Sequence, residues 1–131
     1  MITPAKIQVR FADLDVMGHV NNAVYLSYFE TARVHYFKEI LGSDWDWQKD
    51  GILLVRNEID YLAPILLHDS PYVYIQIEHI GSKSFTLNYE VKVKSKVVTT
   101  GKSVMVCFNN LINQTQTIPE KMKNRLLEIK K

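Results

Sequence analysis

The chain lacks several features that mark whole classes of protein. It has one cysteine, Cys107, in 131 residues, which excludes an internal disulfide framework and a cysteine-based zinc cluster. No stretch approaches the roughly 18 consecutive apolar residues of a membrane-spanning helix, and residues 1–11 lack the apolar core of a signal peptide. We therefore expect a soluble, cytoplasmic protein with no membrane partner.

An excess of charge of one sign is also missing. The chain has 16 basic and 14 acidic residues, which gives a net charge of +2, and its basic residues are scattered. A nucleic-acid partner is therefore not expected. The hydrophobic fraction of 47% is enough for one core of modest size, so residues 1–131 are predicted to form a single domain.

Polar residues are concentrated in one stretch, DLDVMGHVNN at 13–22, directly before a long helix-like segment. The stretch combines two carboxylates, a glycine, an imidazole and two amides. Gly18 permits a tight backbone turn. Asn21 or Asn22 suits the N-cap of the helix, because an Asn side chain can accept a hydrogen bond from a free amide of the first turn. If the protein does chemistry, this stretch is the first candidate for the site.

Hydrophobic periodicity predicts the order strand, long helix, four strands and short helix. Apolar residues at three- and four-residue spacing predict a helix over 23–41 that ends at Gly42. A terminal helix is expected to begin at Pro119, with an apolar stripe of Met122, Leu126 and Ile129. Alternating side chains predict strands at 6–11, 52–62, 72–80, 85–93 and 97–108, with turns at 81–83 and 95–96 and a loop at 109–117.

Single residues within this pattern carry further expectations. Gly101, inside the last long strand, is interpreted as a bulge. In the irregular connector at 43–51, Trp45 and Trp47 either cover the mouth of a pocket or pack against the core. Cys107 lies within an apolar strand, where a buried and unreactive thiol is expected.

A sheet wrapped around the long helix accounts for the whole pattern. An antiparallel sheet of about five strands would bury both the broad apolar face of the helix and one face of each strand. The predicted class is therefore α+β. Such a sheet has two free edges, and pairing of one edge with a second copy would protect it. We therefore expect a dimer.

Several motifs occur together along the chain. They are FADLDVMGHVNN at 11–22, Tyr25, ETAR at 30–33, IDYLAP at 59–64, KSF at 83–85 and the late strand at 101–108. This set resembles the signature of hotdog-fold acyl-CoA thioesterases of the 4-hydroxybenzoyl-CoA thioesterase type. The resemblance implies a hotdog fold, assembly as a homodimer or homotetramer, and hydrolysis of acyl-CoA or acyl carrier protein thioesters without a cofactor or a metal.

The same resemblance implies roles for individual residues. Asp15 is implied to act as nucleophile or general base, and the sequence leaves both mechanisms open. The backbone N–H of Asn22 is implied to polarise the thioester carbonyl, which suits the free amides and positive dipole end of a helix start. Tyr25 is expected to line the acyl pocket. In the family, a run of basic residues before KSF helps to bind the nucleotide phosphates. This chain has only Lys83 at that place, and the resemblance implies that it contacts the substrate.

A second comparison, with plant-type acyl carrier protein thioesterases, bears on His19. Their similar run, DLDVNQHVNN, shares the acidic residues, the histidine and the paired asparagines, and this chain departs from it at Met17 and Gly18. The Asn that Met17 replaces belongs to the active site of that family, so its full arrangement is not carried over. His19 is either a structural histidine or one that faces the substrate.

Other interpretations of these residues stay open. Asp15 could brace its loop instead of acting on a substrate, and Asp13 is expected to bond local amides in an Asx-type turn. A metal site at Asp13, Asp15 and His19 is not expected, because their spacing matches no established ligand pattern. No Gly-x-Ser-x-Gly elbow supports a serine triad. A non-catalytic hotdog protein that binds acyl groups is the alternative from another functional class.

Overall fold

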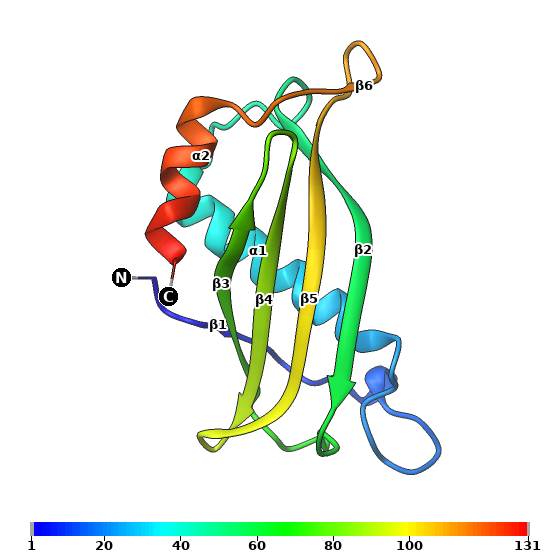
Figure 1. The fold of residues 1–131 in the computed structure, drawn as a ribbon. Coiled ribbons are helices and arrows are strands. Elements are labelled where there is room, and N and C mark those ends of the chain that lie inside the picture. Colours follow the sequence, from blue (N-terminus) through cyan, green and yellow to red (C-terminus); the bar gives the residue numbers. More distant parts are fainter. Residues whose placement is uncertain (1, 131) are drawn as a thin grey trace.

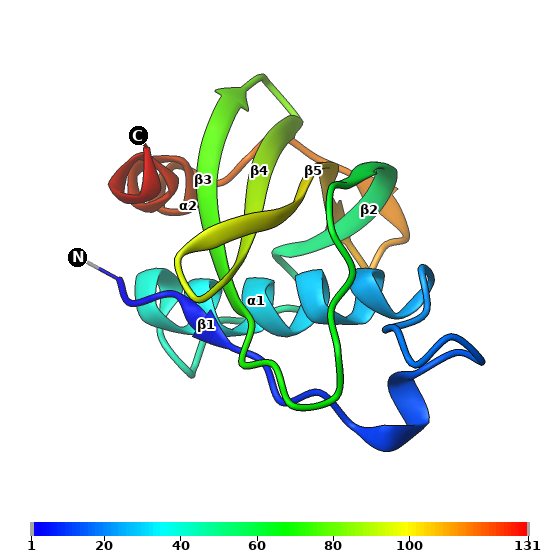
Figure 2. The same cartoon turned by 90° about the horizontal axis from the view of Figure 1, so that it is seen from below.

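The computed structural model describes residues 2–130, in which a curled antiparallel sheet wraps one long helix (Figure 1). The sheet order is β1-β3-β4-β5-β2, with β6 added at one end of β5. Figure 2 shows the sheet curling over α1, with α2 beside β3. This is the architecture that the sequence predicts. The elements are β1 (Ala5–Lys6), the 3₁₀ turn η1 (Phe11–Asp13), α1 (Val24–Leu41), β2 (Gly51–Tyr61), β3 (Tyr72–Ile80), β4 (Ser84–Val93), β5 (Lys96–Asn109), β6 (Gln114–Thr115), α2 (Glu120–Leu126) and η2 (Leu127–Ile129).

Helix α1 fills the concave side of the sheet because most of its circumference is apolar. Phe29 is fully buried and stacks on Tyr89 of β4, with ring centroids 4.0 Å apart and ring planes 3° from parallel. The helix ends as predicted, because Gly42 adopts a φ of +87° and its N–H donates to the Lys38 carbonyl. Its buried residues are Tyr25, Tyr28, Phe29, Ala32, Arg33, Tyr36, Phe37, Ile40 and Leu41.

The long strands follow the sequence prediction closely. β3 has the predicted bounds, and β2, β4 and β5 differ from their predicted bounds by one residue at one or both ends. The β4–β5 turn falls at Lys94 and Ser95, one residue earlier than expected. Both residues have positive φ, 50° and 67°, which a two-residue type I′ hairpin requires.

The predicted strand over 6–11 is shorter in the structure. Only Ala5 and Lys6 pair with β3, the Ile7 N–H donates to the Pro71 carbonyl, and the chain then turns into η1. Side chains still alternate, with Ile7 and Val9 buried. Because β3 begins only at Tyr72, no neighbouring strand is available beyond the first two residues, so the alternation continues without a ladder. The predicted loop at 109–117 likewise contains the short strand β6.

The interpretation of Gly101 as a bulge is wrong. Gly101 pairs in regular register with Ile59 on one side and Tyr89 on the other. A Cβ atom at this position would lie 2.7 Å from Cε2 of Phe29 and 3.0 Å from the Glu58 carbonyl oxygen. The glycine is therefore explained by the close approach of α1 to β5.

Apolar surface remains at one edge of the sheet. Within the described chain, residues 2–130, β2 pairs only with β5, and three consecutive residues of β2, Leu53, Leu54 and Val55, are 45%, 43% and 57% exposed. Exposed edge strands of this kind are usually covered. Between residues 2 and 130, no helix has both the length and the hydropathy that crossing a membrane requires.

Candidate active site

The polar stretch forms a closed loop ahead of α1. The Asp15 N–H donates to the His19 carbonyl at 2.8 Å, and the Gly18 N–H donates to the Asp15 carbonyl at 3.0 Å. Gly18 has a φ of +76°, a conformation that other residues rarely adopt. The tight turn expected at Gly18 is therefore present, and it brings His19 back alongside Asp15.

The Asp15 side chain uses one oxygen for the loop. Its Oδ1 accepts hydrogen bonds from the Met17 N–H at 2.9 Å and the His19 N–H at 3.2 Å. The second carboxylate oxygen receives no hydrogen bond from residues 2–130. Bracing the loop and presenting an oxygen to a ligand are therefore compatible roles of one carboxylate.

Asp13 is a structural residue, although not through the Asx-type turn expected for it. It is 2% exposed and accepts hydrogen bonds from the Arg10 N–H at 3.0 Å, an Arg10 Nη2–H at 3.1 Å and the Tyr28 hydroxyl at 2.8 Å. Burial disfavours its charge, but these hydrogen bonds and the Arg10 charge outweigh burial and lower the pKa of Asp13. It thereby ties η1 to α1. Asx-type contacts are made instead by Asp15 and by Asn21.

The Asn22 amide stands out at the start of α1. Ala23 precedes the first helical residue and has no side-chain cap of its own, but its N–H donates to Asn21 Oδ1 at 2.9 Å. The Val24 N–H donates to the Asn21 carbonyl at 2.9 Å. The Asn22 N–H has no acceptor among residues 2–130, while its carbonyl accepts from the Tyr61 hydroxyl at 2.9 Å. The positive end of the helix dipole thus carries an available donor.

One pocket collects these groups. It has a volume of about 250 Å³, and four of the predicted site residues line it: Asp15, His19, Asn22 and Tyr25. Tyr61, which the sequence pattern did not single out, completes it by packing edge-on against the Tyr25 ring, with centroids 4.9 Å apart. Burial raises the pKa of Tyr25, and the nearby Asp15 charge adds to the effect, so its hydroxyl stays protonated. The other lining residues are Val20, Leu62, Ala63 and Pro64.

Lys83 is not brought to this pocket within one chain. It lies in the turn between β3 and β4, where its carbonyl accepts the Cys107 N–H at 2.8 Å. That turn is at the opposite end of the sheet from the start of α1 (Figure 1). Cys107 itself is fully buried, and burial raises the pKa of its thiol to about 11, as expected of an unreactive cysteine.

A larger cavity lies at the other end of α1. It has a volume of about 520 Å³, and Arg33, 8% exposed, lies in its wall. Arg33 Nη1 donates to the Tyr89 hydroxyl at 3.0 Å, and Nη2 is 3.9 Å from Glu30 Oε2. Trp47 lines this cavity, whereas Trp45 packs and donates from Nε1 to the Asp50 carbonyl. Of the two interpretations of the tryptophans, a place at a pocket therefore suits Trp47 and simple packing suits Trp45.

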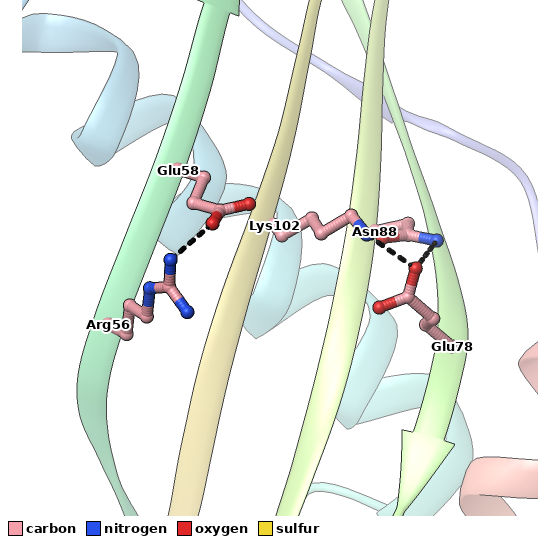
Figure 3. Close-up of polar contacts among 5 residues, drawn as sticks. All are labelled: Arg56, Glu58, Glu78, Asn88 and Lys102. Atoms are coloured by element: carbon pink, nitrogen blue, oxygen red, sulfur yellow. Dashed lines mark hydrogen bonds and ion pairs between the residues drawn. The ribbon is translucent and has the colours of Figure 1, made fainter.

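A polar network covers the outer face of the sheet (Figure 3). Lys102 Nζ lies 2.7 Å from Glu78 Oε1, and Asn88 donates to the same oxygen at 3.3 Å. Arg56 pairs with Glu58 on β2. The hydrogen bond from Lys102 lowers the pKa of Glu78 and the same bond raises the pKa of Lys102. Lys102 is therefore already engaged by a carboxylate on the chain itself.

Comparisons with known proteins agree with this architecture. The chain is 26% identical over 129 residues to the long-chain acyl-CoA thioesterase FadM of Escherichia coli, covering 96% of this chain and 98% of that protein. It is 31% identical over 102 residues to the uncharacterised protein YsmA of Bacillus subtilis, covering 77% and 69%. A crystal structure of a Thermus thermophilus thioesterase complexed with coenzyme A and Zn superposes with a TM-score of 0.85 at 35% identity, covering 97% and 92%.

The family assignment covers nearly the whole described chain. Residues 9–126 match the model of the thioesterase-like superfamily. Solved thioesterases share the arrangement of curled sheet and long helix, so the predicted hotdog fold is confirmed. The chain therefore belongs to the thioesterase-like superfamily, as the motifs around Asp15 indicate.

Proposed function

We propose that this protein hydrolyses acyl-CoA thioesters to a free acid and coenzyme A, with the cytoplasm as its compartment. One observation carries the proposal. Among residues 2–130, one carboxylate oxygen of Asp15 has no donor and the Asn22 N–H has no acceptor, and both residues line the same pocket. A thioester carbonyl needs a donor for its oxygen, and its carbon needs an activated nucleophile. The start of α1 offers both.

In the general-base route, Asp15 takes a proton from water while the water oxygen bonds to the thioester carbon. The Asn22 N–H stabilises the negative charge that develops on the carbonyl oxygen. The tetrahedral intermediate then collapses, the carbon–sulfur bond breaks, and the departing thiolate takes up the proton held by Asp15, which restores the carboxylate. Tyr61 supports the donor indirectly, because its hydroxyl binds the Asn22 carbonyl and so restrains the peptide that follows Asn22.

In the nucleophilic route, the free Asp15 oxygen bonds to the thioester carbon and expels the thiolate, which leaves an acyl–aspartyl anhydride. Water then cleaves the anhydride and restores the carboxylate. In a single turnover in heavy-oxygen water, label in Asp15 identifies the covalent route, because water that attacks the aspartyl carbonyl of the anhydride leaves its oxygen there. The general-base route puts label in the product acid alone. His19 contributes its backbone to the loop in either case, and its side chain lines the pocket.

The decisive experiment measures free thiol from a panel of short, long and aromatic acyl-CoAs, with matched acyl carrier protein thioesters. We expect turnover of at least one acyl-CoA and a fall in kcat of about 10²- to 10³-fold in Asp15→Asn. The melting temperature should be unchanged, since Asn Oδ1 can accept the same two amide bonds. Asp15→Ala, which removes those bonds, is the control for bracing and should melt earlier.

Three results would contradict this proposal. Release from acyl carrier protein thioesters alone would indicate the other carrier. Absence of release from every substrate would indicate an acyl-binding protein. Full activity in Asp15→Asn would remove Asp15 from the chemistry.

We also propose a homodimer, or a tetramer built from it, formed along β2. The exposed side chains of Leu53, Leu54 and Val55 and the unpaired edge of β2 support this face, and Val34 of α1 is 64% exposed nearby in the wall of the same cavity as Leu54. A partner would let Lys83 of one chain approach the pocket of the other. Leu54→Asp should give a monomer in sedimentation velocity, whereas Leu127→Asp, at an equally exposed site on η2, should not. A monomeric unaltered protein would contradict the proposal.

A further inference from the structure

The two buried charged side chains among residues 2–130, Asp13 and Arg33, differ in their partners. Asp13 accepts three hydrogen bonds, one of them from the Arg10 guanidinium at 3.1 Å. Arg33 donates one hydrogen bond, to the neutral Tyr89 hydroxyl at 3.0 Å. Buried charges in folded proteins are usually paired with an opposite charge. Arg33 therefore leaves a positive charge available to an anion.

The Glu30 carboxylate does not neutralise Arg33. Glu30 Oε2 is 3.9 Å from Arg33 Nη2, beyond hydrogen-bonding distance, and the Glu30 side chain is 74% exposed whereas the Arg33 side chain is 9% exposed. Water screens such an exposed carboxylate, so the pair contributes little. Between residues 2 and 130, Nη2 and Nε of Arg33 find no hydrogen-bond acceptor. One side of the guanidinium thus keeps its N–H donors for a ligand.

Helix periodicity places Arg33 at a core position of α1. Phe29 and Phe37 lie one turn to either side of it, and both are buried against the sheet. The bond from Nη1 to Tyr89 of β4 holds the guanidinium in place. Because its backbone and one nitrogen are both fixed, Arg33 presents its remaining donors in one direction.

Arg33 lies in the wall of the cavity of about 520 Å³ at the β2 edge of the sheet. This volume is within the range of about 300–1,000 Å³ that is typical of small-molecule sites. Lys38 also lines the cavity, but its side chain is exposed. Most of the wall is apolar, and its apolar residues are Val34, Phe37, Trp47, Ile52, Leu54 and Met105. The cavity therefore combines an apolar wall with one buried cation.

We propose that this cavity binds a free carboxylic acid, with the carboxylate on Nη2 and Nε of Arg33 and the apolar part of the acid against the apolar wall. The planar guanidinium matches a carboxylate, which accepts two parallel N–H bonds. One buried cation balances a singly charged head group, whereas a phosphate would bring a second negative charge. Val34 and Leu54 belong to the face proposed for the dimer, so a second copy would close the cavity around the acid. The binding does not depend on the proposed hydrolysis.

Calorimetric titration with octanoate and 1-octanol tests the role of the carboxylate, because the two probes differ only in the head group. Octanoate should bind at one site per chain, and 1-octanol should bind about 10- to 100-fold more weakly. Arg33→Met should weaken octanoate binding by a similar factor. Arg56→Met removes an exposed guanidinium from the outer face of the sheet (Figure 3) and should leave the affinity unchanged. Absence of octanoate binding at millimolar concentration, or equal binding by Arg33→Met, would overturn the proposal.

A second variant keeps Arg33 and tests the cavity itself. Ile52→Trp places a large side chain in the cavity and should abolish octanoate binding, and it decides the question if Arg33→Met does not fold. Retained binding in a folded Ile52→Trp would overturn the proposal. Octyl phosphate should bind no more tightly than octanoate, and tighter binding would show that the carboxylate is the wrong head group.

Two further measurements separate this site from the catalytic pocket and from the dimer. Asp15→Asn should bind octanoate as the unaltered protein does, whether or not the protein hydrolyses any thioester. Loss of binding in Asp15→Asn would place the acid in the catalytic pocket and overturn this inference. Arg33→Met should remain a dimer in sedimentation velocity. Dissociation into monomers would assign the missing negative charge to the second copy and would also overturn it.

Discussion

The two ends of α1 hold cavities of opposite character. At the N-terminal end, a pocket of about 250 Å³ is lined by a carboxylate, an imidazole, two phenols and a free backbone amide. At the C-terminal end, a cavity of about 520 Å³ is lined mainly by apolar side chains around Arg33. The two share no lining residue. The smaller one is the better candidate for catalysis, because chemistry depends on available polar groups and not on volume.

The backbone hydrogen bonds of α1 differ between its two ends. At the C-terminal end, Gly42 donates to the Lys38 carbonyl and Arg125 donates to the Ile40 carbonyl, so two of the last four carbonyls have donors. At the N-terminal end, Asn21 satisfies the amides of Ala23 and Val24, and the Asn22 N–H finds no acceptor among the described residues. The N-terminal end of α1 is therefore open to a ligand.

The largest expected effect comes from removing the donor at the open end. Asn22→Pro lacks the backbone N–H and should lower kcat about 10²- to 10³-fold, the usual cost of one oxyanion donor. Proline is tolerated near helix starts, so the fold should survive. Asn22→Ala keeps the N–H and should retain activity within a few-fold. Thiol release and melting temperature are measured for both variants. Equal activity in two well-folded variants would show that the open amide has no role.

The sequence locates this end of α1 well because its residues are neighbours in the chain. Asp15, His19, Asn22 and Tyr25 fall within one loop and the first helical turn, so local turn chemistry is enough to bring them together. Tyr61 reaches the same pocket from β2, which depends on sheet register that periodicity alone does not give. The signal for Tyr61 in the sequence is the IDYLAP motif, which supports the family resemblance but does not by itself indicate the pocket. Lys83 is the opposite case: its motif predicts a place at the site, but within one chain it lies at the other end of the sheet, because a motif match does not determine distance from the pocket.

In the middle of α1, Phe29 packs against Gly101 of β5, and the sequence pattern predicts the wrong role for this glycine. A glycine inside a strand suggests a bulge, whereas Gly101 is needed because the Phe29 ring packs directly on it. This contact joins residues far apart in the chain, so no local pattern contains it. Strand bounds, which depend on local alternation, were predicted to within one residue for β2, β4 and β5.

The contact between Gly101 and the Phe29 ring should be sensitive to one added methyl group. Gly101→Ala places a Cβ 2.7 Å from the Phe29 ring and should destabilise the fold by about 1–3 kcal/mol through overpacking. Thermal melting should fall by about 3–10 °C for a chain of this size. In a Phe29→Leu background, where the ring is absent, the same change should cost less, and this coupling is the control. Equal costs in the two backgrounds would assign the effect to the Glu58 carbonyl oxygen, 3.0 Å from the same Cβ, instead of to the ring.

The smallest effect separates the two carboxylates of the open end, the buried and hydrogen-bonded Asp13 and the Asp15 that we propose for the chemistry. Tyr28→Phe removes one of the hydrogen bonds to Asp13 and should cost about 1 kcal/mol at neutral pH, with little change in kcat. Because the folded state lowers the pKa of Asp13, its ionised form stabilises the protein above the ordinary value of 3.8, and this contribution is lost as pH falls through the folded pKa.

The pH dependence of melting tests the assignment of Asp13. Removing the Tyr28 donor raises the pKa of Asp13 in the folded state toward its ordinary value. The difference in free energy of unfolding between the unaltered protein and Tyr28→Phe should therefore be largest at neutral pH and should become smaller below pH 3.8. Tyr36→Phe removes another buried hydroxyl from α1 and should give a gap that does not change over this range. A constant gap for Tyr28→Phe would mean that its hydroxyl acts through packing, because only a bond to an ionised Asp13 loses strength when the carboxylate is protonated.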